Sequence, residues 1–306
     1  MVYQVPVILQ VMSINFEMMH GIFILIIATL ALAYTSLHFA SPVLAIFFRW
    51  ARWILFAFAF AYLIGYVGGS TRPFWVLSVS AFLLWFVLET VYYWLAIAQY
   101  SYSQLPLFLD FKENKAGDEW PNQKRFISLR EWLRSRQFIP IVALKAELDQ
   151  NISLRSSIYQ SDGNKIRLQI HFVPQRNGNV SVCFIFTSLL ENGSRIITDN
   201  IFQPFGGFYP EKWHLVRKPW VRSLNRLFMR HHRRMVEYGG VFVPWDDDPL
   251  YDINDQQRHL ERINIELGFL FPRELQEKHG KITWEGRYRV WKELWLLNFL
   301  GIAHHY

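Results

Sequence analysis

The chain has 306 residues, 32 Lys and Arg against 25 Asp and Glu, and a single cysteine. This length allows one or two domains, the single cysteine excludes an intramolecular disulfide, and the modest net charge argues against a nucleic-acid-binding protein. Charges are rare at the start, because residues 1–96 carry only Glu17, Arg49, Arg52, Arg72 and Glu89. The sequence therefore predicts a membrane region followed by a water-soluble domain.

Three apolar stretches near the N-terminus are long enough to cross a bilayer, which takes about 20 residues. The predicted spans cover about 21–39, 48–67 and 74–96. Pro42 and the segment Gly68–Pro73 separate them, since proline disfavours a continuing helix and glycines with polar residues mark loops.

Basic residues around the spans predict their orientation. Arg49 and Arg52 are assigned to the loop between the first two spans, Arg72 to the loop between the second and third, and seven Lys and Arg lie between 112 and 136. The positive-inside rule then places the N-terminus outside and the C-terminal domain in the cytoplasm. We expect a multi-pass protein with three spans, in a bacterial inner membrane.

Glu89 lies inside the third predicted span, where a charge costs roughly 2.5–3.5 kcal/mol on insertion scales. One interpretation is a functional group, either a proton or ion relay or a polar contact to another subunit. The other places Glu89 near the cytoplasmic end of the span, either protonated or paired with Arg49 or Arg52 at the same end of the second span. The position of Glu89 in the last third of its span favours this second interpretation.

The soluble part contains three apolar runs that predict strands, at 165–173, 180–190 and 196–202. The first alternates Ile166, Leu168, Ile170 and Phe172 with Lys165, Arg167, Gln169 and His171. Asn177-Gly178 and Asn192-Gly193 separate the runs, and Asn-Gly is typical of tight hairpin turns. We therefore predict an antiparallel meander of three to five strands, with Ile152–Tyr159 as a candidate fourth strand.

Helices are expected to cover one face of this sheet. A short helix should begin at Ser128, followed by helices at about Pro219–Tyr238, Asn254–Phe271 and Trp284–Ala303. The last is rich in aromatic residues and either packs in the core or lies along the membrane surface. The predicted fold class is α+β, with a two-layer cytoplasmic domain of three to five strands covered by three to four helices, following an N-terminal bundle of three transmembrane helices. The predicted domains are a transmembrane region over 1–98, a linker over 99–125 and the α+β domain over 126–306.

A run of basic residues carries the clearest functional signal. No Asp or Glu lies between 212 and 236, and five basic residues are spaced four apart, with Arg233 beside the last: Lys218, Arg222, Arg226, Arg230 and Arg234. On one helix this spacing gives a cationic stripe opposite an apolar side. Such a stripe binds anionic lipid headgroups or an acidic protein, or is simply a solvated helix face.

A polar cluster offers an alternative. His231 and His232 precede Asp246, Asp247 and Asp248, and histidine with carboxylate can bind a divalent metal that activates water. Adjacent histidines on a helix point about 100° apart, however, and His231 falls on the apolar side. We therefore expect a hydrogen-bonded core histidine rather than a metal ligand, and no metal or other cofactor.

Two classes of function remain open. The first is a membrane-anchored, non-catalytic interaction or scaffold domain at the cytoplasmic face, as a subunit of a membrane protein complex. Its expected partners are the lipid bilayer, another membrane or cytoplasmic protein, anionic lipid and a second copy of the chain. The second class is a membrane-associated, metal-dependent hydrolase that uses His231, His232 and Asp246–Asp248. Convergence of these residues in a concave site would favour the hydrolase.

Overall fold

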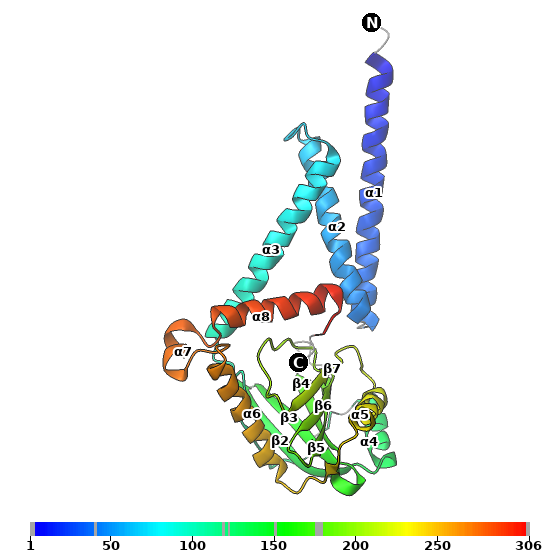
Figure 1. Cartoon of the computed structure of the whole chain (residues 1–306). Helices are drawn as coiled ribbons and strands as arrows, with labels where there is room; N and C mark the ends of the chain where they lie inside the picture. The colour runs from blue at the N-terminus through cyan, green and yellow to red at the C-terminus, as the bar shows by residue number, and fades with distance from the viewer. Residues whose placement is uncertain are drawn as a thin grey trace. The chain divides into compact units, whose positions relative to one another are not determined.

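Figure 1 shows the computed structural model of the chain, which describes residues 4–39, 42–117, 120–121, 123–149, 152–174 and 180–303. The chain forms two compact units. One contains Met1–Ala96 and Trp295–Ile302, and the other contains Ile97–Leu294 and Ala303–Tyr306.

The first unit contains three long apolar helices. They are α1 (Gln4–Phe39), α2 (Pro42–Tyr66) and α3 (Phe74–Tyr102), the last of which continues into the second unit. By length and composition alone, each could cross a membrane, over Glu17–Ser36, Val43–Tyr66 and Phe74–Tyr102. Three apolar helices are thus confirmed, but Arg49 and Arg52 lie inside α2 and not in a loop. Proline is tolerated in the first turn of a helix, so α2 can begin at Pro42.

Aromatic rings pack the C-terminal π-helical turn η2 (Leu296–Leu300) against α2 within the first unit. Trp53 is 1% exposed and stacks on Phe82, with ring centroids 4.7 Å apart. It also meets Phe299 edge-on at 5.4 Å, and the Nε1–H of Trp50 donates to the Phe299 carbonyl at 2.9 Å. The end of the last predicted helix therefore packs in the core of the first unit, and not in that of the second.

The second unit is built on a mixed sheet, for which the described residues give eight strands. In spatial order, seven of them are β1 (Phe111–Glu113), β2 (Ile139–Asp149), β3 (Ile152–Gln160), β4 (Arg167–Pro174), β5 (Val180–Leu190), β6 (Arg195–Asp199) and β7 (Trp213–Arg217). Neighbours are antiparallel except β6 and β7, which are parallel. The short β8 (Phe242–Val243) pairs with β5.

The predicted apolar runs form β4, β5 and β6, and the candidate fourth strand is β3. These strands pair as the predicted antiparallel meander. The sheet is larger than the predicted three to five strands and is mixed, because β7 joins it parallel to β6 after a crossover through 200–212. The segment predicted as a linker supplies β1 and the start of a helix. The predicted turn at Asn177-Gly178 lies outside the described residues.

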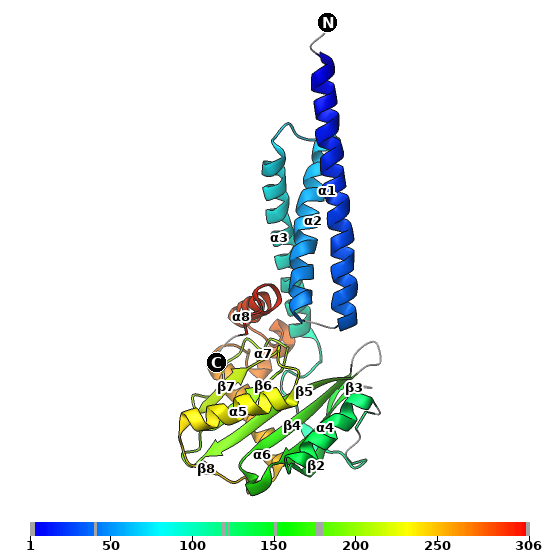
Figure 2. The same ribbon diagram turned by 90° about the vertical axis from the view of Figure 1, so that its right-hand side faces the viewer.

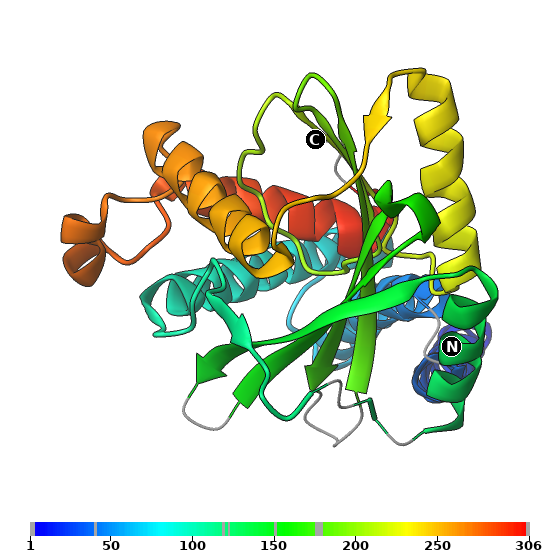
Figure 3. The same ribbon diagram turned by 90° about the horizontal axis from the view of Figure 1, so that it is seen from below.

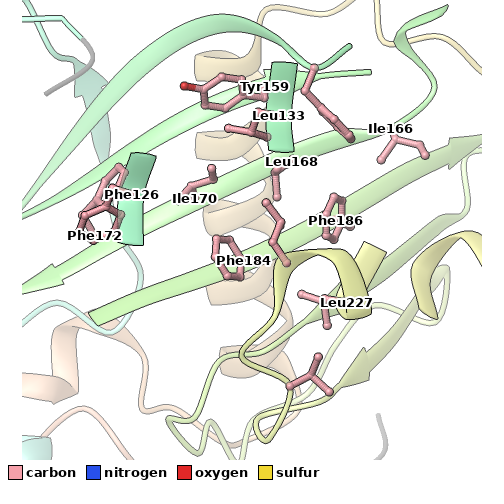
Figure 4. Packing of buried hydrophobic residues seen from close by; sticks show 13 residues of the cluster. Phe126, Leu133, Tyr159, Ile166, Leu168, Ile170, Phe172, Phe184, Phe186 and Leu227 are labelled. Carbon is pink, nitrogen blue, oxygen red and sulfur yellow. The ribbon is translucent and has the colours of Figure 1, made fainter. Parts of the chain in front are cut away.

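Helices lie on both faces of the sheet (Figure 3). On one face, α4 (Lys124–Ser135) and α5 (Leu224–Tyr238) pack against the side chains of Ile166, Leu168, Ile170 and Phe172 (Figure 4). This part of the prediction is confirmed, since all four side chains are buried.

On the opposite face, α6 (Pro249–Glu266) places Ile253 against Leu144 and Ile158. The predicted two-layer arrangement is therefore wrong, and the domain has three layers. The helices α7 (Arg273–His279) and α8 (Trp284–Trp295) follow α6 in the chain.

Local capping sets where the helices begin. The Ser223 hydroxyl accepts from the Arg226 N–H, so α5 begins at Leu224 and not near Pro219. Asp248 accepts from the Leu250 N–H at 3.0 Å and caps α6. In α4 the prediction is wrong by one turn, because Ser128 lies inside the helix and its hydroxyl donates to the Arg125 carbonyl.

The turn at Asn192-Gly193 yields a stability prediction. Gly193 has φ +78°, and no atom lies within 4 Å of where a Cβ would stand, so backbone strain alone opposes a side chain there. We expect Gly193→Val to destabilise the domain by about 1–2 kcal/mol. The control Gly193→Asn should cost less, because asparagine tolerates positive φ. Thermal melting of the full-length protein in detergent checks this, and equal melting temperatures for Gly193→Val and the parent would contradict the strain.

Candidate functional site

The structure divides the predicted cationic stripe among different environments. Lys218 and Arg222 lie in the non-helical segment before α5, because Ser223 caps the helix only after them. Arg226 and Arg230 are exposed on α5, as is Arg233, whose guanidinium pairs with Glu237 at 2.7 Å. The five residues spaced four apart therefore do not form one helical face.

Arg234 points to the sheet instead of outward. Its guanidinium donates to the carbonyls of Ile197 and His214 and to the Thr198 hydroxyl, the last at 2.7 Å. It thus fastens α5 to both β6 and β7. Burial lowers the pKa of Arg234, against the raising effect of Glu237. We assign Arg234 a structural role, and it is not part of the predicted outward-facing stripe.

Helix α4 supplies cations that the stripe did not include. The two helices lie beside each other on the same sheet face (Figure 2), where the Trp132 ring meets the Phe228 ring at 5.5 Å. The Trp132 Nε1–H also donates to the Asn225 side chain at 3.2 Å. Helix α5 alone therefore does not define the basic region of the domain.

We call the exposed cations of the two helices and their flanks the basic surface. Its members are Lys124, Arg125, Arg130, Arg134, Arg136, Arg222, Arg226, Arg230 and Arg233. Among the described residues of the same two segments, the exposed carboxylates are Glu131 and Glu237. The basic surface therefore has nine exposed cations and two exposed carboxylates. The sequence contained all of these residues, but the two groups lie almost a hundred positions apart, and no local pattern joins them.

His231 has the environment of a core residue. It is 0% exposed, stacks on Phe186 with centroids 5.6 Å apart, and shares hydrogen bonds with the hydroxyls of Ser188 at 3.1 Å and Thr198 at 3.0 Å. Burial, and then the nearby charge of Arg234, lower the pKa of His231 to about 3, so the ring is neutral at pH 7. Both ring nitrogens are used by the fold.

The residues of the hydrolase alternative do not converge. His232 and Asp246–Asp248 are exposed. His231 lies on the sheet-facing side of α5, whereas the Asp247 carbonyl accepts from Arg167 on the opposite face of the sheet, which α6 covers. Within the described part of the chain, no group of three or more His, Cys, Asp and Glu could hold a metal ion. The geometry therefore gives this alternative no support.

Glu89 forms an ion pair within the first unit. Its side chain is buried, and the Arg52 guanidinium lies 3.2 Å from its carboxylate. This is one of the two pairings that the sequence indicated. A paired carboxylate between two apolar helices needs no further role to explain its presence.

The sheet face under α6 carries a buried network that sequence reasoning missed. Asp252 of α6 accepts from both Arg167 on β4 and Arg195 on β6, the latter at 2.7 Å. Beside them, Asp199 pairs with Arg217 on β7 at 3.0 Å. The alternation of β4 did place Arg167 and His171 on one face. It could not indicate that a helix with a matching carboxylate covers that face.

Comparison with protein-family models, with curated proteins and with solved structures found no match for this chain.

The buried His231 gives a pH prediction. Its pKa is about 3 in the folded state and about 6.5 in an unfolded chain. Below pH 6.5 the unfolded state binds more protons, so this contribution to stability is complete above pH 6.5 and declines toward pH 3. Between pH 6.5 and pH 5 the loss is about 2 kcal/mol. The buried His171, whose pKa burial lowers to about 4, acts in the same direction.

We expect the melting temperature of the full-length protein to fall between pH 7.5 and pH 5. His231→Gln should reduce this fall, whereas His232→Gln, the same change at the exposed neighbour, should leave it as in the parent. If His231→Gln and His232→Gln show the same pH dependence, His231 does not titrate as its burial requires.

Proposed function

We propose that this protein is a membrane-anchored, non-catalytic interaction domain and a subunit of a membrane protein complex, in which the basic surface binds an acidic protein. The observation that carries the proposal is the excess of nine exposed cations over two carboxylates on two adjacent helices. Potentials of one sign over such a surface attract and orient partners of the opposite sign.

Folding stability alone does not explain this accumulation. Like charges four residues apart on a helix destabilise it by a few tenths of a kcal/mol, and Arg226 with Arg230 and Arg130 with Arg134 are such pairs. Exposed charges contribute little to stability in other ways. The repulsion within the basic surface therefore favours a role outside the fold.

The composition of the basic surface favours a protein partner over lipid. Eight of its nine cations are arginine, which binds carboxylates through two parallel hydrogen bonds and is enriched in protein interfaces, where lysine is depleted. Exposed apolar side chains accompany the cations, with Ile127 59%, Met229 55% and Val236 68% exposed. Methionine is likewise enriched in interfaces. Anionic lipid headgroups remain the alternative that the experiment below separates.

We further propose that the three apolar helices cross a bacterial inner membrane, with the N-terminus outside and the α+β domain in the cytoplasm. Support comes from the distribution of Arg and Lys. Arg49 and Arg52 lie in the first half of α2, seven Lys and Arg lie between 112 and 136, and Arg72 is alone in the connection between α2 and α3. The positive-inside rule assigns the richer sides to the cytoplasm.

Fusions test this topology. A C-terminal alkaline phosphatase fusion should be inactive and the matching green fluorescent protein fusion should be bright, because the phosphatase matures only outside the cytoplasm. Truncated fusions after Gly69, between α2 and α3, should give the reverse pattern and serve as the control. An active phosphatase at the C-terminus would overturn the proposed orientation.

Charge removal tests the basic surface. We expect full-length protein in neutral phosphatidylcholine nanodiscs to bind polyglutamate, and the binding to weaken as salt is added. The triple variant Arg222→Gln, Arg226→Gln and Arg230→Gln should bind at least tenfold more weakly and keep the parent's melting temperature, since all three side chains are exposed. Arg234 is left unchanged because it holds α5 to the sheet.

The matched control removes three exposed cations elsewhere, through Arg258→Gln, Arg262→Gln and Lys278→Gln on α6 and α7. It should bind as the parent does. Vesicles containing phosphatidylserine, tested in parallel, identify the lipid alternative if they bind and polyglutamate does not. Equal binding of polyglutamate by the parent and the triple variant would contradict a role for the basic surface.

A further inference from the structure

A cavity of about 210 Å³ lies in the second unit, on the sheet face away from the basic surface. Side chains of β4, β5, β6 and β7 form its floor, and Ile253, Gln256, Gln257 and Leu260 of α6 line it from the other side. Segments before β1, before β7 and before α6 complete the wall. It is thus built from elements spread over most of the domain.

Aromatic side chains make much of the wall. Phe111, Tyr209, Trp213 and Trp245 all line the cavity. The His171 ring stacks on Phe111 with centroids 6.0 Å apart and planes inclined by 17°. The Arg167 guanidinium covers the Trp245 ring, 3.9 Å from its centroid. The remaining faces and edges of the rings, among aliphatic side chains, suit a planar apolar group.

Three residues of the lining each carry a buried polar atom that has no hydrogen-bond partner among the described residues. These atoms are Nε1 of Trp245, Nε of Arg167 and Nδ1 of His171, on residues that are 3%, 3% and 9% exposed. Buried polar atoms of folded proteins nearly always have a partner, so unpaired ones call for an explanation. Two of the three are obligatory N–H donors. A molecule that satisfied them would need a hydrogen-bond acceptor.

The charges around the cavity balance. Arg167, Arg195 and Arg217 face Asp252, Asp199 and Glu293, with which they form ion pairs at 3.9 Å or less. Burial lowers the pKa of His171 to about 4, so this ring adds no charge at pH 7. A buried carboxylate or ammonium brought in by a ligand would therefore find no free counter-charge among these groups, and its desolvation would oppose binding.

The volume limits the size of the guest. An apolar cavity of about 150 Å³ in a protein core is known to admit benzene. The present cavity of about 210 Å³ is moderately larger and therefore accommodates one ring with a small polar substituent. It lies below the range of about 300–1,000 Å³ that is usual for larger ligands.

We propose that this cavity binds a small, uncharged molecule with a single ring and a hydrogen-bond acceptor, the acceptor meeting Trp245 Nε1–H and Arg167 Nε–H while the ring packs among Phe111, Trp213 and Trp245. The site shares no residue with the basic surface, which lies on the other face of the sheet. Binding of a small molecule in the cavity and binding of polyglutamate at the basic surface can therefore be measured separately in the same preparation.

Three probes of similar shape test the proposal: benzamide, benzoate and toluene. Full-length protein in nanodiscs is titrated with each at pH 7, and binding is followed by ligand-observed saturation-transfer NMR. We expect saturable binding of benzamide that is at least tenfold tighter than that of benzoate, which carries a charge. Toluene, which has the ring and no acceptor, should bind more weakly than benzamide.

Variants locate the binding. Ile185→Trp on β5 places a larger side chain in the cavity and should abolish the saturable signal, leaving the background from partition into lipid. Trp245→Phe keeps a ring and removes one N–H, so benzamide should bind about five- to tenfold more weakly and toluene unchanged. The matched control is Trp284→Phe on α8, the same change at a tryptophan that is 68% exposed, and it should bind all probes as the parent does.

Several outcomes would overturn the proposal. Tighter binding of benzoate than of benzamide would make this an anion site. An absent benzamide signal, or one that a folded Ile185→Trp variant retains, would show that the cavity takes no such guest. If Ile185→Trp does not fold, an equal loss of benzamide and toluene in Trp245→Phe, or no loss of benzamide, rejects the assigned hydrogen bond and with it the proposal.

Discussion

The burial of a charged sheet face under α6 is the constraint on which the α+β domain depends. An ion taken out of water is costly unless a partner of opposite charge and further hydrogen bonds compensate it. Asp252, on α6, meets Arg167 of β4 and Arg195 of β6, and Gln256 donates a further hydrogen bond to it at 2.9 Å. Loss of one member of a buried pair typically costs about 3–5 kcal/mol, because the other is left uncompensated. Asp252 therefore fixes where α6 can lie as firmly as its apolar side chains do.

The same constraint accounts for the parallel pair at the end of the sheet. In the register of β6 and β7, Asp199 lies beside Arg217, so the parallel pairing brings the two charges together. Burial raises the pKa of Asp199, and the guanidinium of Arg217 opposes that rise. Glu293 of α8 lies 3.9 Å from the same arginine and also accepts the Phe205 N–H at 3.0 Å. A strand with a long crossover is thus fixed by charge pairing as well as by its ladder of hydrogen bonds.

Local signals of the sequence predicted the elements, whereas the pairing of distant charges was beyond them. The alternation from Ile166 to Phe172 identified β4 because a strand has period two, and long apolar runs identified α1, α2 and α3. The same alternation is expected for a solvated face and for one covered by a polar helix, so nothing near Arg167 revealed Asp252, 85 positions away. The basic stripe failed for a related reason. The spacing of four extends across Ser223, the N-cap of α5, so its first two members lie outside the helix. In addition, five of the nine cations of the basic surface come from α4 and its C-terminal flank.

Strand β6 connects the two faces of the domain. Consecutive side chains of a strand point to opposite sides of the sheet, so Thr198 and Asp199 serve different neighbours. Thr198 accepts from Arg234 and shares a hydrogen bond with His231, both of α5, under the basic surface. Asp199 holds Arg217 at the cavity on the other face. Any displacement of β6 that alters the Asp199–Arg217 pair must also move the residue that anchors α5, because the two positions are adjacent along one backbone.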